Sequence, residues 1–149
     1  MRDTINKDLK EATLARDKER TATLRLISAA IKDRDIVARG AGAERASDPE
    51  LIELLAKMIK QREESARLYD EGGRPELADK ERGEIAVIRT YLPQQLDETA
   101  TGTAIDRAIA DSGAASIKDM GKVMALLKER HAGQMDFSKA SAAVRAKLG

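Results

Sequence analysis

Residues 47–76, SDPELIELLAKMIKQREESARLYDEGGRPE, contain the start of one helix, its end, and the start of the next. Ser47 and Pro49 are typical of a helix cap and first turn, and Glu50 places a negative charge at the positive end of the helix dipole. Apolar residues then recur at helical spacing, at Leu51, Leu55, Met58 and Ile59. Gly72-Gly73 ends the helix, because glycine readily adopts the left-handed conformation that helix ends need. The stretch predicts two helices joined by a short turn.

The helical spacing continues toward the N-terminus. One apolar set lies within residues 5–15 and a second within residues 24–38, at Ile5, Leu9, Ala12, Ala15, Leu24, Ile27, Ile31 and Ala38. Gly40 and Gly42 interrupt the pattern, so we expect a loop over residues 41–46.

Toward the C-terminus, Pro75 starts a helix that we expect to run through Tyr91 until Pro93 ends it. The ring of Tyr91, beside Pro93, is expected to pack between the two halves of the chain. No segment of useful length alternates at the spacing of a β-strand.

A domain boundary is expected at residues 93–98, because the helices beyond it are shorter and richer in alanine. The expected helix starts there are Asp97, Ser116 and Asp136. Asp119, three residues after Ser116, stands where a capping box has its acidic residue. The predicted fold is all-α, with an N-terminal helical bundle over residues 1–92 and a small helical tail domain over residues 97–149.

The composition agrees with a helical protein of one or two small domains. Of the 149 residues, 36% are charged and only 2% are aromatic, and there is no cysteine. We therefore expect a cytoplasmic protein without disulfides or thiol chemistry. The charged N-terminal residues do not resemble a secretory signal, and the longest nearly apolar run, Leu24–Ile31, is far shorter than the roughly 20 residues of a membrane span, so no membrane partner is expected.

Charge is distributed unevenly along the chain. Residues 1–92 carry 19 basic and 19 acidic side chains, residues 97–117 have a net charge of minus three, and residues 118–149 have a net charge of plus four. The basic end could contact phosphates. An ordinary solvated helix face would look the same, and the charge alone does not separate these two interpretations.

Residues 116–127, SIKDMGKVMALL, point most directly to a function. Gly121 lies within the expected helix, where glycine costs about 1 kcal/mol relative to alanine. We therefore expect either a neighbouring helix or a ligand to approach the backbone closely there. Lys118, Lys122 and Lys128 make a polyanion a suitable ligand, and the first two are expected one turn apart on one helix face. The alternative is close helix packing at Gly121 with solvated lysines.

Residues that could carry catalysis are scarce. His131 is the only histidine, and its place near a helix end favours a capping role over that of a catalytic base. The chain has no HExxH, GxxxxGK[ST], GxGxxG or GxSxG motif. With only three aromatic residues, RNA binding would depend on phosphates and shape instead of base stacking. We therefore expect no catalytic residue, metal or cofactor.

Three segments resemble the YqeY-like family, also called GatB/YqeY. They are TLRLISAAIKDR (residues 23–34), the long run from LLAKMIKQ to YLPQQL (residues 54–96) and GAASIKDMGKVMALLKER (residues 113–130). The order and spacing match the family over almost the whole chain. One departure is HAGQMDFS (residues 131–138), which lacks the lysine often found there in the family, and Lys139 follows as a substitute.

The resemblance implies an all-helical fold, with an N-terminal bundle and a helical tail. In the family, the same unit forms the C-terminal part of the B subunit of tRNA-dependent amidotransferases and is attached to some glutaminyl-tRNA synthetases, where it is taken to hold tRNA during translation. The family label of carbon–nitrogen ligase with glutamine as amido-N-donor looks inherited from the whole amidotransferase.

The leading hypothesis is a non-catalytic module that binds tRNA or assists a tRNA-modifying or aminoacylating enzyme. The expected RNA contacts are Lys118, Gly121, Lys122, Lys128, Arg130, Lys139 and Arg145. The alternative is a protein-interaction module that docks on a partner enzyme through the N-terminal helices without RNA contact, which an exposed apolar stripe on the second or third helix would support. The third hypothesis, an amidotransferase component active only in complex, requires a nucleophile or metal site that the sequence does not show.

Overall fold

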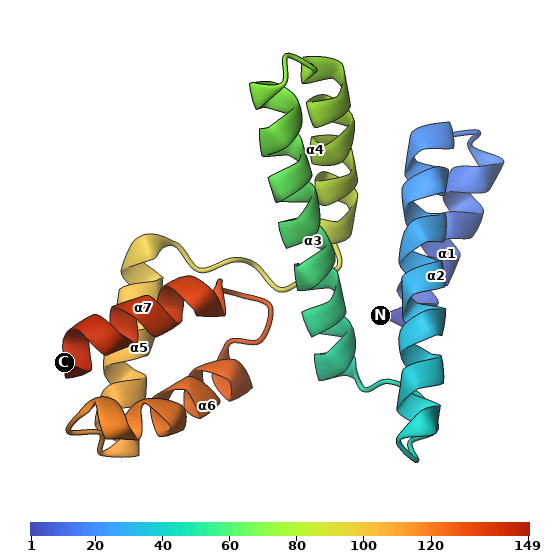
Figure 1. The fold of residues 1–149 in the computed structure, drawn as a ribbon. Coiled ribbons are helices and arrows are strands. Elements are labelled where there is room, and N and C mark those ends of the chain that lie inside the picture. Colours follow the sequence, from blue (N-terminus) through green and yellow to red (C-terminus); the bar gives the residue numbers. More distant parts are fainter. The chain divides into compact units, whose positions relative to one another are not determined.

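A computed structural model describes all 149 residues, and it is all-helical, with seven α-helices and one short 3₁₀ helix. The chain forms two compact units, Met1–Leu92 and Pro93–Gly149 (Figure 1). Each unit has its own hydrophobic core. No helix is both long enough and apolar enough to cross a membrane.

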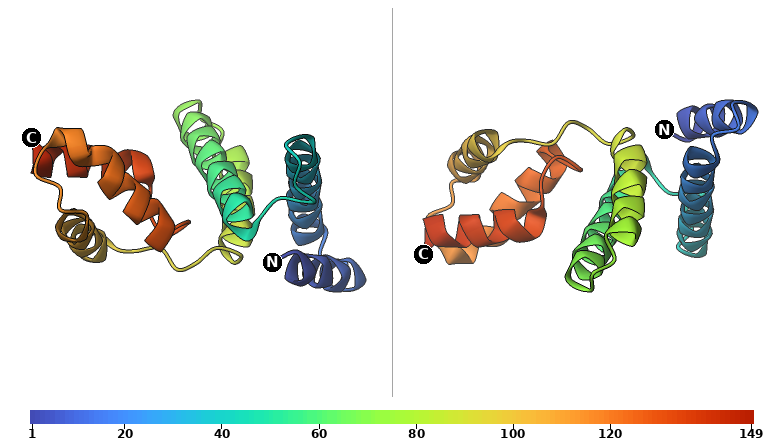
Figure 2. Two further views of the ribbon diagram at one scale, coloured as in Figure 1. Left: turned by 90° about the horizontal axis from the view of Figure 1, so that it is seen from below. Right: turned by 90° about the horizontal axis from the view of Figure 1, so that it is seen from above.

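The first unit consists of two helical pairs. Helices α1 (Arg2–Leu14) and α2 (Lys18–Gly40) form one pair, and α3 (Asp48–Glu71) and α4 (Pro75–Arg89) form the other. Helices α3 and α4 run side by side in both views of Figure 2. The fully buried side chains of this core come from all four helices and include Ile5, Leu24, Ile27, Leu51, Leu55 and Ile88.

The start and end of α3 confirm the prediction from residues 47–76. The Ser47 hydroxyl accepts the Glu50 backbone N–H at 3.3 Å as the N-cap, and it donates to the Glu50 carboxylate at 3.0 Å. At the other end, Gly73 adopts a left-handed φ of 73°, and the Arg74 N–H donates to the Tyr69 carbonyl at 2.8 Å. These bonds satisfy backbone groups that a helix end leaves unpaired.

Helix α4 ends earlier than predicted. Its last residue is Arg89, and Thr90 is the C-cap, so the helix does not continue through Tyr91. Tyr91 packs against the core of the first unit, and its hydroxyl donates to the Asp8 carboxylate of α1 at 2.5 Å. Burial and this hydrogen bond raise the pKa of the Tyr91 phenol. Tyr91 thus packs on the first unit, and its expected place between the two halves of the chain stays a prediction.

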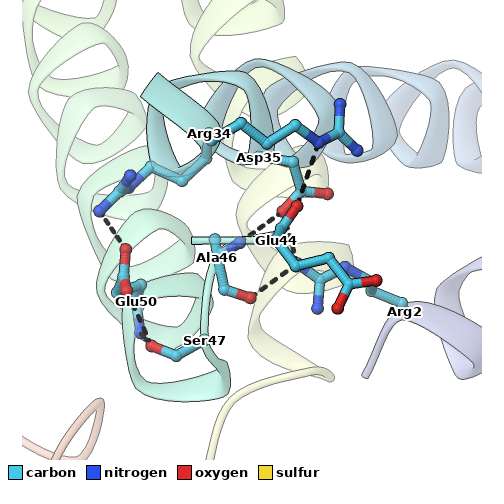
Figure 3. Close-up of polar contacts among 8 residues, drawn as sticks. Arg2, Arg34, Asp35, Glu44, Ala46, Ser47 and Glu50 are labelled. Carbon is cyan, nitrogen blue, oxygen red and sulfur yellow. Dashed lines mark hydrogen bonds and ion pairs between the residues drawn. The ribbon is translucent and has the colours of Figure 1, made fainter. Parts of the chain in front are cut away.

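Asp35 is the centre of a polar cluster that joins three segments of the first unit (Figure 3). Its carboxylate accepts hydrogen bonds from the Arg2 guanidinium at 2.5 Å and from the Ala46 N–H at 2.9 Å, while Arg2 also donates to the Ala46 carbonyl at 2.8 Å. The Arg2 and Asp35 side chains are only 18% and 14% exposed. The bond from Arg2, followed by the bond from Ala46, lowers the pKa of the Asp35 carboxyl. The cluster attaches α1 to α2 and fixes the end of the loop before α3.

Two further ion pairs connect neighbouring helices of this unit. Arg34 of α2 pairs with Glu50 at the start of α3, and Arg62 of α3 pairs with Glu84 of α4 at 2.8 Å. The Arg62 and Glu84 side chains are largely buried, which makes their pairing necessary because an isolated buried charge is costly.

The second unit contains α5 (Glu98–Ser112), the 3₁₀ helix η1 (Ile117–Asp119), α6 (Met120–Arg130) and α7 (Phe137–Leu148). The predicted caps are confirmed for α5 and α7, since Asp97 accepts the Ala100 N–H at 2.7 Å and Asp136 accepts the Ser138 N–H at 2.9 Å. Small and aliphatic side chains form the core, namely Ala104, Ile105, Ala108, Val123, Leu127, Ala140 and Val144.

Replacing Asp35 with asparagine should lower the free energy of unfolding by about 1–3 kcal/mol at pH 7, because a charge-assisted hydrogen bond becomes a neutral one. The folded-state pKa of Asp35 lies below its ordinary value of 3.8. Its contribution is therefore complete above that value and is lost as the pH falls through the lower folded-state pKa. Denaturant titrations from pH 7 to pH 2.5 should show wild type and Asp35→Asn converging at the acidic end.

Asp33→Asn is the matched control, since Asp33 is exposed on the same helix. It should change stability by less than about 0.5 kcal/mol. A stability difference for Asp35→Asn that stays constant down to pH 2.5 would contradict the assigned role.

Candidate nucleic-acid interface on helix α6

The start of α6 differs from the prediction. Ser116 begins the 3₁₀ helix η1 without a side-chain cap, and α6 itself begins at Met120. The Asp119 carboxylate accepts the N–H of Ala115, the residue before Ser116, at 3.0 Å, and the Ser116 hydroxyl makes no cap bond, so the predicted pair of capping-box bonds is not formed. The bond from Ala115, more than the nearby charge of Lys122, lowers the pKa of Asp119.

This change of helix start moves Lys118 away from its expected position. Lys118 lies in η1 and Lys122 in the first turn of α6, so the two do not stand one turn apart on a single α-helix. Both side chains are exposed, and both lie close to the N-terminal end of α6.

Gly121 is exposed and lies against open space. A Cβ atom added there would meet no heavy atom within 4 Å, apart from its own helix backbone and chain neighbours. Close packing of a neighbouring helix was one of the two explanations for this glycine, and the structure contradicts it. The other explanation, an approaching ligand, stays a hypothesis.

The outer face of α6 combines small and charged residues. Gly121, Lys122, Ala125, Lys128 and Glu129 are all exposed, while Val123 and Leu127 on the opposite side are fully buried. Gly121 and Ala125 are one turn apart, so that a strip without large side chains runs beside the lysines. We call Gly121, Lys122, Ala125 and Lys128, together with Lys118 of η1 just before the helix, the α6 face. The sequence analysis missed Ala125, although its spacing of four residues from Gly121 is visible in the sequence.

The net charge of this surface is modest. Asp119 and Glu129 lie next to the three lysines, which leaves an excess of one positive charge. Lys118 and Lys128 form no ion pair and can reach an anionic ligand without breaking one. Lysine side chains on four-carbon stems can also reach past the neighbouring acids.

Much of the predicted charge separation in the tail is neutralised internally. Arg130 pairs with Asp111 of α5 at 2.8 Å, and Lys147 pairs with Asp106 of α5. The acidic segment and the basic segment thus fold against each other. Arg130 would have to leave Asp111 to bind a phosphate, which makes it a weaker RNA contact than the sequence indicated.

The remaining predicted contacts lie on other surfaces. Lys139 lines a groove of about 720 Å³ between α5 and α7, and no residue of α6 lines that groove. Arg145 is exposed on α7 outside it. The structure therefore does not bring the seven predicted residues together into one site.

His131 is the C-cap residue of α6 and its backbone N–H donates to the Leu127 carbonyl at 2.9 Å. Its ring Nδ1 lies 3.2 Å from the Gln134 side-chain oxygen. No group of three or more histidine, aspartate or glutamate side chains is placed to hold a metal ion.

A second surface of interest is apolar and lies on α2. Leu26, Ile36 and Val37 are 46%, 62% and 63% exposed, which is unusual for large aliphatic side chains clustered on one helix. This exposed stripe is the feature that a protein-docking function would require.

Comparison with known proteins gives a family over nearly the whole chain. A family model described as "Yqey-like protein" matches residues 2–148. The curated relatives include fungal proteins named "Altered inheritance of mitochondria protein 41, mitochondrial". The protein from Lachancea thermotolerans is 34% identical over 90 residues, which cover 60% of this chain and 46% of the relative.

Two other relatives of that name are similarly distant. The protein from Saccharomyces cerevisiae is 33% identical over 87 residues, covering 58% of this chain and 45% of its own length. The protein from Vanderwaltozyma polyspora is 34% identical over 100 residues, covering 62% and 52%. This chain spans about half the length of the curated relatives it matches.

Replacing Gly121 with alanine should stabilise α6 by about 0.5–1 kcal/mol, because alanine loses less backbone entropy and its methyl group meets nothing. Amide hydrogen exchange of α6 in the full chain measures this. Ala125→Gly, one turn later on the same face, is the matched control and should destabilise α6 by a similar amount. A destabilised Gly121→Ala variant would mean that a neighbouring group occupies the space beside Gly121.

Proposed function

Because this chain belongs to the YqeY-like family, we propose that it is a non-catalytic helical module that binds tRNA through the α6 face. The observation that carries the proposal is Gly121, a glycine in the first turn of α6 that lies beside open space and between exposed lysines. Glycine at that point admits a ligand to the helix backbone, and the lysines around it would bind a polyanion.

The chemistry of the α6 face supports phosphate contact with little base readout. Lys122 and Lys128 are six residues apart, about 9 Å along the helix axis, so they would contact different phosphates. The α6 face contains no aromatic side chain, which leaves no platform for base stacking. The chain would thus recognise the shape and backbone of a folded RNA.

In this proposal, the chain positions tRNA for an enzyme that does the chemistry. A tRNA-dependent amidotransferase or an aminoacyl-tRNA synthetase is the proposed partner, and a carbon–nitrogen ligase activity belongs to such a complex. The cytoplasm is the proposed location, in keeping with the absence of cysteine. The names of the fungal relatives place those proteins in mitochondria.

The second candidate function is docking on a partner enzyme through the N-terminal helices. The exposed Leu26, Ile36 and Val37 of α2 favour it, because they put three large aliphatic side chains on the outside of one helix, where a partner helix could cover them. The net charge of zero over residues 1–92 also suits a protein partner better than RNA.

The test of the tRNA proposal is binding of the full chain to bulk tRNA by fluorescence anisotropy at several salt concentrations. Wild type should bind more weakly as salt rises, because binding releases counterions. The triple variant Lys118→Ala, Lys122→Ala and Lys128→Ala should lower the slope of log K against log salt by about 0.7–0.9 for each phosphate that a lysine no longer neutralises. Gly121→Ala should weaken binding although it stabilises the helix.

The matched control is Lys7→Ala, Lys10→Ala and Lys80→Ala, which removes the same charge from exposed positions of the first unit. This control should keep the salt slope of wild type. Equally weakened binding in both triple variants would show a non-specific charge effect, and no binding even at low salt would refute the proposal for the isolated chain.

A further inference from the structure

The exposed side of α2 follows a coiled-coil heptad. Its seam residues are spaced alternately by four and three positions, and all of them are exposed: Ala22, Leu26, Ala29, Asp33, Ile36 and Gly40. The side of α2 that faces the core is formed by other residues, which include Leu24, Ile27 and Ile31. Helix α2 therefore has one apolar face in the core and a second, narrower one that nothing in the first unit covers.

One edge of this seam is uniformly basic. Arg25, Lys32 and Arg39 are seven residues apart and occupy the g position of each heptad, where charged residues select the partner helix. Arg25 and Lys32 form no ion pair, and Arg39 donates to the backbone carbonyl of Glu44 at 3.0 Å. No acid of the first unit therefore neutralises Arg25 or Lys32 by direct pairing.

The other edge of the seam opens into a groove against α3. The groove measures about 390 Å³, and its walls include Leu26, Ala29 and Asp33 of α2 and Leu54, Lys57 and Gln61 of α3. Lys57 is exposed and adds a positive charge to this wall. The seam is thus apolar except for Asp33, and basic residues lie on both sides of it.

We propose that the α2 seam binds an amphipathic helix of a partner protein that presents leucine-like residues to the seam and acidic residues along its edges. The proposal rests on the second candidate function and names its site and partner chemistry. The exposed apolar residues of the seam would contact the apolar face of the partner helix. The basic residues of the g row favour a partner helix with negatively charged edges.

A second copy of this chain does not fit the same seam. In an antiparallel pair of α2 helices, the two g rows would face each other and both are basic. In a parallel pair, each g row would face the e positions Thr23, Ala30 and Val37, which carry no acid. Asp33 in the middle of the seam also argues against insertion into lipid, where an unpaired carboxylate is costly.

The probe is a fluorescent four-heptad peptide with leucine at a and d and glutamate at e and g, and its twin has lysine at e and g. The full chain should bind the acidic peptide and not the basic twin. Arg25→Glu with Lys32→Glu should weaken binding of the acidic peptide about tenfold and allow the basic twin to bind. Asp33→Leu should tighten binding of the acidic peptide, because it removes a charge that the complex would bury.

Lys7→Glu with Lys10→Glu is the matched control, since it makes the same charge change at exposed positions of α1 and should leave both affinities unchanged. Circular dichroism checks that every variant is folded. The proposal is overturned if the acidic peptide does not bind, or if Arg25→Glu with Lys32→Glu leaves the affinity for that peptide unchanged. It is also overturned if only phosphatidylserine vesicles or a second copy of the chain binds at the α2 seam.

These experiments test the tRNA proposal and the peptide proposal independently of each other. The triple lysine-to-alanine variant of the α6 face should bind the acidic peptide as wild type does. Arg25→Glu with Lys32→Glu should bind tRNA with the salt sensitivity of wild type. If the acidic peptide binds equally well to wild type and to Arg25→Glu with Lys32→Glu, the peptide binds another face of the first unit. The assignment to α2 is then wrong.

Discussion

The carboxylate of Asp35 joins three segments of the first unit by hydrogen bonds: the start of α1, helix α2 and the loop before α3. Arg2 approaches from α1 and Ala46 from the loop before α3, and each is joined to Asp35 by a hydrogen bond in a largely buried place. Without the carboxylate, the Arg2 guanidinium and the Ala46 N–H would lose an acceptor that water cannot easily replace. The placement of α1 on α2, and with it the burial of Ile5, depends on this cluster.

Outside the two hydrophobic cores, two exposed surfaces carry the proposed functions. In the tail, α5 pairs with Arg130 and Lys147, while the three lysines of the α6 face stay exposed beside its open glycine. In the first unit, α1 and α3 each expose one large aliphatic side chain, Leu14 and Leu68, while α2 exposes Leu26, Ile36 and Val37. The two proposed ligands therefore differ in chemistry, a polyanion at the α6 face and an amphipathic helix with acidic edges at the α2 seam.

Local signals predicted the helices well, because caps, glycine stops and apolar spacing act within a few residues of each other, as Ser47 and Asp97 show. The signals failed where distant residues decide the outcome. Arg130 finds Asp111 only in the folded tail, and the open space beside Gly121 is a property of the whole unit. The basic g row of α2 is readable from the sequence, but its meaning depends on knowing which side of the helix the core leaves uncovered.

The hydrogen bond from Tyr91 to Asp8 has a consequence for the order of folding. It joins residues 83 positions apart, so forming it closes most of the first unit into a loop and carries a large entropic cost. The turns at Gly73 and at residues 15–17 join neighbouring helices and close much shorter loops. We therefore expect the two helical pairs to form first and the contact between Asp8 of α1 and Tyr91 to form last. During synthesis, α2 leaves the ribosome soon after α1, whereas the Asp8 carboxylate lacks its Tyr91 donor until almost the entire first unit has emerged.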